Sequence, residues 1–199
     1  VTGLAKVLEK HEEIVGKSVI DEIRLLAERL QGKIIQHINS TAVGGGVAEI
    51  LARMVPLMKE LGLETYWDVI RGGEEFFQVT KTFHNALHGK DVQISDNMFD
   101  IYNANTRMNL ETSRINGDFI VVHDPQPAGL IELRKGDGKK WIWRCHIDVS
   151  NPHPRVWGFL EPMVARYDAS IFSASIFARH LNIRQFLITP SIDPLSDKN

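Results

Sequence analysis

The sequence has one cysteine, almost no net charge and no long apolar run. Cys145 is the single cysteine, so a disulfide within the chain and a cluster of thiolate metal ligands are both excluded. The formal net charge is −2 at pH 7, which provides no basic field for nucleic acid or an anionic membrane. No apolar stretch approaches the roughly 20 residues that a membrane-spanning helix requires. We therefore expect a cytoplasmic protein that binds neither nucleic acid nor membrane.

The composition gives no indication of disorder either. Hydrophobic residues make up 43% of the chain and charged residues 24%, which is ordinary for a globular protein. A chain of 199 residues is long enough for one large domain with a substantial core. The sequence begins at Val1 rather than methionine, with amphipathic helical sequence instead of a signal peptide. We expect it to be a piece of a longer protein.

Helix and strand patterns alternate along most of the chain. Residues 4–31 carry apolar side chains at helical spacing, and Gly16 and Gly32 are expected to separate and end these helices. The predicted strands are residues 33–39, 63–70, 118–123, 141–146, 169–172 and 185–189. The predicted helices between them are residues 47–61, 74–87, 96–114, 128–134 and 155–167.

This alternation predicts an α/β fold. A strand, a helix and a second strand in succession form a parallel pair joined by a right-handed crossover. The near-continuous apolar run at residues 119–122 suits a strand that is buried on both faces of a parallel sheet. We therefore predict a three-layer α/β/α, doubly wound, Rossmann-like sheet, preceded by a helical extension over residues 1–32. Trp141 and Trp143 are expected in the core, one ring on each side of the sheet.

The sheet edge that carries the carboxyl ends of the strands is the expected ligand site. Ligands of open α/β sheets bind beyond those ends. Four loops follow predicted strands at that edge: residues 39–47, 123–127, 146–152 and 190–194. The polar residues and glycines of the chain collect in the same four loops, so we predict the site there.

Gly44-Gly45-Gly46 lies between a predicted strand and a helix N-terminus. Without side chains the backbone can approach a ligand closely, and the free N–H groups of the helix start favour an anion such as phosphate. The spacing matches neither the dinucleotide fingerprint G-x-G-x-x-G nor a P-loop, because no Gly-Lys-Ser/Thr follows. The alternative is a tight turn without a ligand.

His123 and Asp124 end a buried strand and precede Pro125-Gln126-Pro127. The prolines stop the strand and stiffen the loop. An ionised Asp124 could accept two hydrogen bonds from vicinal sugar hydroxyls. The alternative is that Asp124 caps the following turn and His123 is a satisfied core histidine.

His146-Ile147-Asp148 repeats this pattern at the end of the next strand. Neighbouring parallel strands would place His146 and Asp124 at one mouth, as an acid/base pair or as metal ligands. No recognised metal-ligand spacing joins these residues, so we expect no metal. His84 and His88 share a helix face, but the glutamate of zinc helices is missing between them.

Five segments resemble a known family. They are Ile38-Asn39-Ser40-Thr41 with Gly44–Leu51, Phe77–Leu87, Val122–Ala128, Trp143–Asp148 and Pro190–Leu195. Together they resemble the N-terminal half of the trehalose glycosyltransferring synthases, which are retaining GT-B glycosyltransferases. The resemblance runs from about residue 18 to the C-terminus.

The resemblance implies one half of a two-domain enzyme. Enzymes of this kind have two Rossmann-like domains that face a deep cleft, the N-terminal one binding the acceptor and the C-terminal one the sugar nucleotide. It implies an acceptor-side domain over residues 33–190 and the start of an interdomain crossover over residues 191–199. The C-terminal donor domain would lie beyond Asn199, so this chain alone would not turn over. A homodimer is also left open.

Residue roles follow from the resemblance alone. Gly44–Gly46 would face the donor diphosphate, His146 would contact the donor glucose near its anomeric centre, and Asp124 would bind the acceptor sugar. His123, Gln126 and Asp148 would support substrate binding. The implied reaction is transfer with retention from a nucleoside-diphosphate-glucose to glucose, forming trehalose without a cofactor. The β-phosphate of the donor would serve as the base, so no protein nucleophile is required.

Three other functions are weighed against this one. A retaining trehalose phosphorylase has similar domains and would use phosphate instead of a nucleoside diphosphate. A sugar- or nucleotide-binding module without activity needs only one such domain. A nicotinamide oxidoreductase needs an acid at the end of the second strand. Its nearest candidate, Asp68, lies inside a predicted strand, so we discount it.

Overall fold

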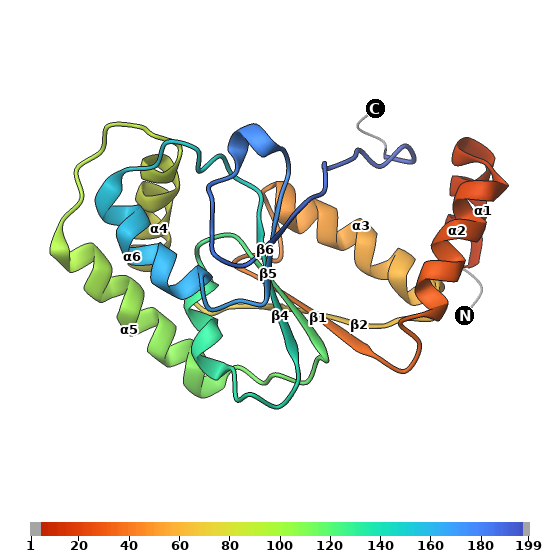
Figure 1. Ribbon diagram of the computed structural model, residues 1–199, viewed down its shortest axis with the longest axis horizontal. Helices are drawn as coiled ribbons and strands as arrows, with labels where there is room; N and C mark the ends of the chain where they lie inside the picture. The colour runs from red at the N-terminus through yellow and green to blue at the C-terminus, as the bar shows by residue number, and fades with distance from the viewer. Residues whose placement is uncertain (1–4, 197–199) are drawn as a thin grey trace.

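The computed structural model of the chain describes residues 5–196 as three layers around one parallel sheet (Figure 1). The predicted helix start at residue 4 and the end of the predicted crossover, residues 197–199, lie outside the described residues. The N-terminal helices α1 (Ala5–Val15) and α2 (Lys17–Glu28) meet at Gly16, whose φ of 86° favours glycine. They pack together and against α3 (Gly46–Glu60) at one end of the molecule.

Six parallel strands form the central layer. Their bounds are β1 Ile34–Asn39, β2 Glu64–Val69, β3 Phe119–His123, β4 Lys140–Cys145, β5 Ala169–Phe172 and β6 Arg184–Leu187. The strand order is β2-β1-β3-β4-β5-β6, and every neighbouring pair is parallel. The order reverses between β1 and β3, which makes the gap between their following loops the topological switch point of the sheet.

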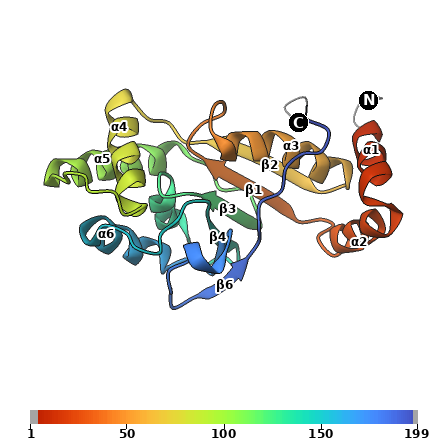
Figure 2. The same cartoon turned by 90° about the horizontal axis from the view of Figure 1, so that it is seen from above.

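The connecting helices divide between the two faces of the sheet (Figures 1 and 2). Helix α3 joins β1 to β2 on one face. Helices α4 (Glu74–Leu87), α5 (Asp96–Thr112) and α6 (Pro154–Val164) cover the other face. Two short 3-10 helices, η1 (Ala128–Leu133) and η2 (Ser175–Phe177), follow β3 and β5. The predicted elements are all present, and the largest differences are two helix ends: α2 ends at Glu28 rather than at residue 31, and α6 ends at Val164 rather than at residue 167.

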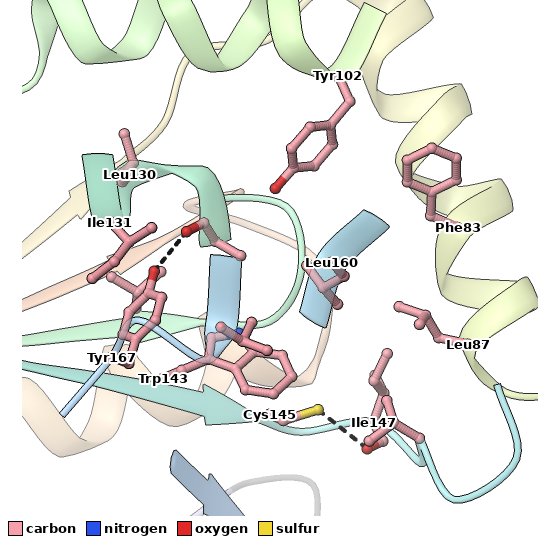
Figure 3. Close-up of a cluster of buried hydrophobic side chains, with 14 of the residues drawn as sticks. Phe83, Leu87, Tyr102, Leu130, Ile131, Trp143, Cys145, Ile147, Leu160 and Tyr167 are labelled. Carbon is pink, nitrogen blue, oxygen red and sulfur yellow. Dashed lines mark hydrogen bonds between the residues drawn. The ribbon is translucent and has the colours of Figure 1, made fainter. Parts of the chain in front are cut away.

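The main core lies between the sheet and helices α4 to α6, and Figure 3 shows part of it. Trp143 of β4, Phe83 of α4 and Leu160 of α6 belong to this one cluster. Trp141 belongs to it as well, so the prediction of one tryptophan ring on each side of the sheet was wrong. Residues two apart in a strand point to the same face, which puts both rings on the α4 side.

The opposite face has a much smaller apolar core. It consists of Ala27, Ile35 and Leu63, with partly buried apolar side chains of α2, α3 and β3 around them. Buried polar residues stand on the same face nearer the carboxyl edge, and they include His37, His123 and Arg144. Beyond β6 the chain returns to the helices of this side, where Asp193 pairs with His11 and Arg53.

The predicted α/β fold with a parallel sheet and N-terminal helices is confirmed. Within residues 5–196, no helix combines the length and the apolar character that crossing a bilayer demands.

Candidate functional site

The glycine loop, Gly44–Gly46, follows β1 at the sheet edge where the site is predicted. Gly44 and Gly45 have φ values of 73° and 95°, which side chains rarely allow. A β-carbon added at either position would meet no heavy atom within 4 Å, so the loop is bare of neighbouring side chains. Gly45 is the N-cap of α3 and provides no side-chain cap. The first amides of α3 therefore point out of the helix without a side-chain acceptor.

Asp124 stands at the end of β3 in a strained backbone conformation. Its φ of 65° is the only positive value for a non-glycine residue among residues 5–196. Three contacts hold it there. Its N–H donates to the Arg144 carbonyl at 2.9 Å, its carbonyl accepts from Trp143 Nε1 at 3.0 Å, and its Oδ1 accepts from the His146 N–H at 2.7 Å. The carboxyl group thus ties the loop after β3 to the loop after β4.

The Asp124 carboxyl group also has an unusual acidity. Burial raises the pKa of Asp124 to about 7, although the His146 amide and the charge of Arg144 oppose this. The sequence analysis considered only the ionised form of this carboxyl group. The structure instead provides a group that changes protonation near neutral pH, and that uses one oxygen to hold the backbone of His146.

His146 follows β4 and lies within hydrogen-bond reach of His123. The distance from His146 Nε2 to His123 Nδ1 is 2.9 Å, and the two rings are stacked with an interplanar angle of 18°. Burial, assisted by the charge of Arg144, lowers the pKa of His146 to about 4. At neutral pH this imidazole is therefore neutral, and it acts as a hydrogen-bonding group rather than a cation.

Arg144 is a charged group of this site that the sequence reasoning missed. It is buried on the same face of the sheet as His123, and its guanidinium donates to the carbonyls of Phe172 and Ile188. Both hydrogen bonds go to the main chain, so its positive charge stays available to the rim of the site. Its position within a predicted strand, two residues before His146, was the only signal in the sequence.

The remaining predicted residues lie around this centre in different directions. Gln126 lines a narrow crevice with Asn105 and Leu130, on the α5 side of the sheet. Its buried Oε1 has no hydrogen-bond partner among the described residues. Asp148 accepts a hydrogen bond from the Ser150 N–H at 2.8 Å, which shapes its own loop. Hydrogen bonds thus join Asp124, His123 and His146, while Gly45 follows the adjacent strand β1 at the same sheet edge and Gln126 lies on the α5 side.

A separate cavity lies on the α5 side of the sheet, beside the edge strand β2, and neither Asp124 nor the histidines line it. It has a volume of about 350 Å³ and is lined by Gln36, Asp68, Asn109 and Arg114, among others. The amide of Gln36 is fully used within the protein, because it donates to Asp68 and the Arg114 carbonyl and accepts from two backbone amides. The candidate site is instead an open rim, as expected of one wall of a cleft.

Metal ligation receives no support from the side-chain arrangement. Within residues 5–196, no three or more His, Cys, Asp or Glu side chains are grouped to hold an ion. His84 and His88 stack with ring centroids 4.5 Å apart on α4, and His88 Nδ1 lies 3.0 Å from the His84 carbonyl.

Comparisons with known proteins identify relatives of the chain. A family described as "Trehalose synthase, N-terminal domain" matches residues 37–179. The trehalose synthase of Thermococcus litoralis is 45% identical over 201 residues, which cover 99% of this chain and 48% of that protein. The trehalose synthase of Rubrobacter xylanophilus is 41% identical over 210 residues, covering 98% and 48%. A trehalose phosphorylase of Pleurotus pulmonarius is 27% identical over 176 residues, covering 77% and 24%.

The chain thus spans about half the length of the trehalose synthases it matches. The family match covers most of the chain, including the strands and loops that form the rim from β1 to β5. The resemblance inferred from the sequence segments is therefore confirmed, and the chain belongs to the glycosyltransferase family of trehalose synthase N-terminal domains.

Proposed function

We propose that this chain forms the acceptor-side wall of a retaining glycosyltransferase. The full-length protein would transfer glucose from a nucleoside-diphosphate-glucose to glucose and so form trehalose. The family membership supports the reaction class. The observation that carries the proposal is that Gly45, Asp124 and His146 follow adjacent parallel strands at one sheet edge. That edge is where ligands of such sheets bind.

The start of α3 would bind the donor diphosphate. Its first amides have no side-chain cap, and the bare loop at Gly44–Gly46 leaves room for a phosphate oxygen to reach them. The partial positive charge of a helix N-terminus favours a dianion and the additional charge that develops as the sugar departs. The buried cation of Arg144 adds to the same positive field.

Asp124 and His146 would bind the two sugars. The acceptor hydroxyl attacks the anomeric carbon on the face that the diphosphate leaves, the glycosidic C–O bond to phosphate breaks, and the hydroxyl proton passes to the β-phosphate. A neutral His146 suits this reaction, because it can hydrogen-bond a sugar hydroxyl without adding charge near the anomeric centre. The free oxygen of Asp124 would receive an acceptor hydroxyl, with His123, Gln126 and Asp148 in supporting positions.

A donor domain would supply the other wall of the cleft. Since the trehalose synthases it matches are about twice as long, this chain alone is expected to show no transfer. Following β6, the chain runs past α1 and α3, so residues 191–196 leave the sheet on the α3 side as a crossover to a second domain would. The unpaired, buried Cys145 suits a reducing, cytoplasmic setting.

Activity measurements on the full-length protein test the proposal. Asp124→Ala should raise the KM for glucose roughly tenfold by removing one hydrogen bond to the acceptor. His146→Ala should lower kcat about 100-fold while changing the KM for glucose little. His84→Ala on α4 is the matched control, because it removes a histidine whose ring contacts His88 and none of the three rings at the rim. Unchanged kinetics in both rim variants would refute these roles, and transfer by the 199-residue chain alone would refute the half-cleft.

Trehalose phosphorylase is the second candidate, and the relation to the Pleurotus protein motivates it. The two activities differ in the co-substrate. Incubating trehalose with the full-length protein and either a nucleoside diphosphate or phosphate separates them, since only a phosphorylase yields glucose 1-phosphate. A protein that binds these sugars but transfers nothing with any donor would instead be a binding module.

A further inference from the structure

Three histidines form a continuous hydrogen-bonded chain from the interior of the sheet to the rim. His37 Nδ1 lies 3.0 Å from His123 Nε2, and His123 Nδ1 lies 2.9 Å from His146 Nε2. His37 and His123 are buried, with exposed fractions of 4% and 3%. His146 is only partly buried and ends the chain at the site.

The register of the sheet explains why these rings meet. His37 on β1 is paired with Val121 on β3, and His123 on β3 is paired with Arg144 on β4. Each histidine therefore stands two residues nearer the carboxyl edge than the one before it. Residues two apart share a face, so all three rings lie on the α3 side in one diagonal row. This row crosses the switch point between β1 and β3.

Proton counting restricts the chain to two arrangements. A neutral imidazole has one N–H donor and one acceptor nitrogen. Each of the two hydrogen bonds needs one proton between its nitrogens. The nitrogen that carries the proton on His123 therefore fixes which nitrogen carries it on His37 and on His146. Either all three rings carry the proton on Nε2, or all three carry it on Nδ1. In the first arrangement His146 offers an acceptor to the site, and in the second it offers a donor.

The buried end of the chain favours the second arrangement. His37 Nε2 is buried and has no hydrogen-bond partner among the described residues. Protonation of that nitrogen would leave a donor without an acceptor inside the protein. Buried N–H groups without an acceptor are rarer than buried acceptors without a donor. Protonation on Nδ1 instead pairs the proton with His123.

The surroundings keep the rings neutral. Burial lowers the pKa of His37 to about 4, and burial together with the neighbouring rings and Arg144 places the pKa of His123 well below its usual value. The charged groups next to the rings of His123 and His146 are Arg144 on β4 and Asp124 after β3. A cation nearby opposes protonation of either ring.

We propose that His37 and His123 are positioning residues that hold His146 as a neutral Nδ1–H donor toward the bound sugar. His37 lies on β1, two strands from His146, and does not touch the substrate. The step from a common tautomer to catalysis rests on the role proposed above for His146. The tautomer itself can be measured without any substrate.

Nitrogen NMR on the ¹⁵N-labelled 199-residue chain at pH 7 tests the proposal directly. Long-range ¹H–¹⁵N correlations report which ring nitrogen carries the proton, and His→Gln variants assign the signals. We expect His37, His123 and His146 all as neutral Nδ1–H rings, with the exposed His180 as the internal reference. A different tautomer in any of the three, a common Nε2–H state, or an imidazolium at pH 7 would overturn it.

Variants of His37 test the coupling. In His37→Phe, His123 loses the partner that fixes its ring, so the His146 signal should move toward the tautomer mixture of His180. His37→Asn restores an amide donor to His123 and should restore the His146 tautomer. Ile35→Val is the matched control, two residues along the same face of β1. An unchanged His146 tautomer in His37→Phe would refute the coupling. If His37→Phe does not fold, His37→Leu takes its place, because leucine likewise has no donor for His123.

Kinetics of the full-length protein separate this inference from the proposed function. His37→Phe should lower kcat roughly tenfold without changing the KM for glucose, and His37→Asn should recover most of it. If the NMR shows the common tautomer while His146→Ala transfers glucose normally, the histidine chain stands and the role of His146 fails. If His146→Ala is impaired but the three rings show mixed tautomers, the role of His146 stands and the proposed histidine chain fails.

Discussion

The two faces of a single strand of this sheet differ in chemistry. On β4, Trp141, Trp143 and Cys145 point toward α4 to α6 and are completely buried in the apolar core. Ile142 and Arg144 alternate with them and point toward the α3 side, where the buried polar side chains of the candidate site lie. One strand thus belongs to the core and to the site at once.

This division teaches how the fold can carry a polar site without losing stability. The α4 side buries large aromatic and aliphatic side chains, and such burial is the main stabilising term of a folded domain. The α3 side has a small apolar cluster, and its buried histidines and arginine use hydrogen bonds to one another and to the backbone. We expect substitutions on the α4 side to act on stability, and substitutions on the α3 side to act on protonation and ligand binding.

The largest effect is expected on the α4 side. Trp143→Ala removes a fully buried ring and leaves a cavity, which should lower the free energy of unfolding by about 3–5 kcal/mol. Ile142→Ala, one residue away on the partly buried opposite face, should cost about 1–2 kcal/mol. Urea unfolding followed by tryptophan fluorescence and circular dichroism measures both. Equal losses would mean that the two faces contribute alike.

The pH dependence of stability is expected to report the α3 side. The depressed pKa values of His37, His123 and His146 mean that the unfolded chain binds their protons more readily below about pH 6.5. Their contribution is present above that pH and is lost as the pH falls toward 4. The raised pKa of Asp124 has the opposite sign over the same window, because the folded chain holds that proton up to about pH 7.

The three histidines with lowered pKa values outweigh Asp124 with its raised pKa, so the free energy of unfolding should rise from pH 4 to pH 6.5. Each group contributes a slope of up to about 1.4 kcal/mol per pH unit. Urea titrations at half-unit intervals measure the slope. His37→Phe should reduce it, and Asp124→Asn should steepen it. A free energy of unfolding that falls over this window would mean that the rings titrate normally in the folded chain and that only Asp124 is shifted.

Asp124→Ala is expected to have a moderate effect on stability. It leaves the His146 N–H without its acceptor and places an alanine at a φ of 65°, so the free energy of unfolding should fall by about 1–3 kcal/mol. Asp124→Asn keeps an acceptor oxygen and a residue type that tolerates this φ, so it should cost less than about 1 kcal/mol. A loss in Asp124→Asn as large as in Asp124→Ala would mean that the carboxyl group itself stabilises the loop.

Much of the fold could be predicted from the sequence, because hydrophobic periodicity and strand-ending glycines and prolines are local signals. The rule for carboxyl ends of parallel strands predicted one sheet edge for Gly45, Asp124 and His146, and these residues do follow the adjacent strands β1, β3 and β4. Contacts that depend on register could not be predicted in this way. Nothing in the run around His37 indicates that it meets His123, since the pairing of β1 with β3 places them together.

Three further misses have identifiable causes. The strained φ of Asp124 depends on the hydrogen bonds of neighbouring strands and not on its own sequence. The two tryptophans were placed on opposite faces although residues two apart share a face, so that error lay in applying the strand period. The acidity of the Asp124 carboxyl group depends on burial, which a sequence does not report.

The smallest effect on stability, and the sharpest contrast with Trp143, is expected in the glycine loop. Val43 is 82% exposed, whereas Trp143 has no exposed surface. The Thr41 hydroxyl donates to the carbonyl of Val43 and accepts from the N–H of Val43. These contacts involve only the backbone of Val43, so Val43→Ser keeps them. The free energy of unfolding should change by less than about 0.5 kcal/mol.

The same substitution should nevertheless alter function, because an exposed apolar side chain beside the helix start that we propose for the donor phosphate is available to the donor or to the second domain. In the full-length protein we expect the KM for the sugar nucleotide to change severalfold at unchanged stability, whereas Ile142→Ala should change stability and leave that KM alone. Measuring unfolding and donor KM on the same preparations decides the matter. If Val43→Ser destabilised the chain by more than about 1 kcal/mol, the loop would be part of the packed structure and not a surface kept free for a ligand.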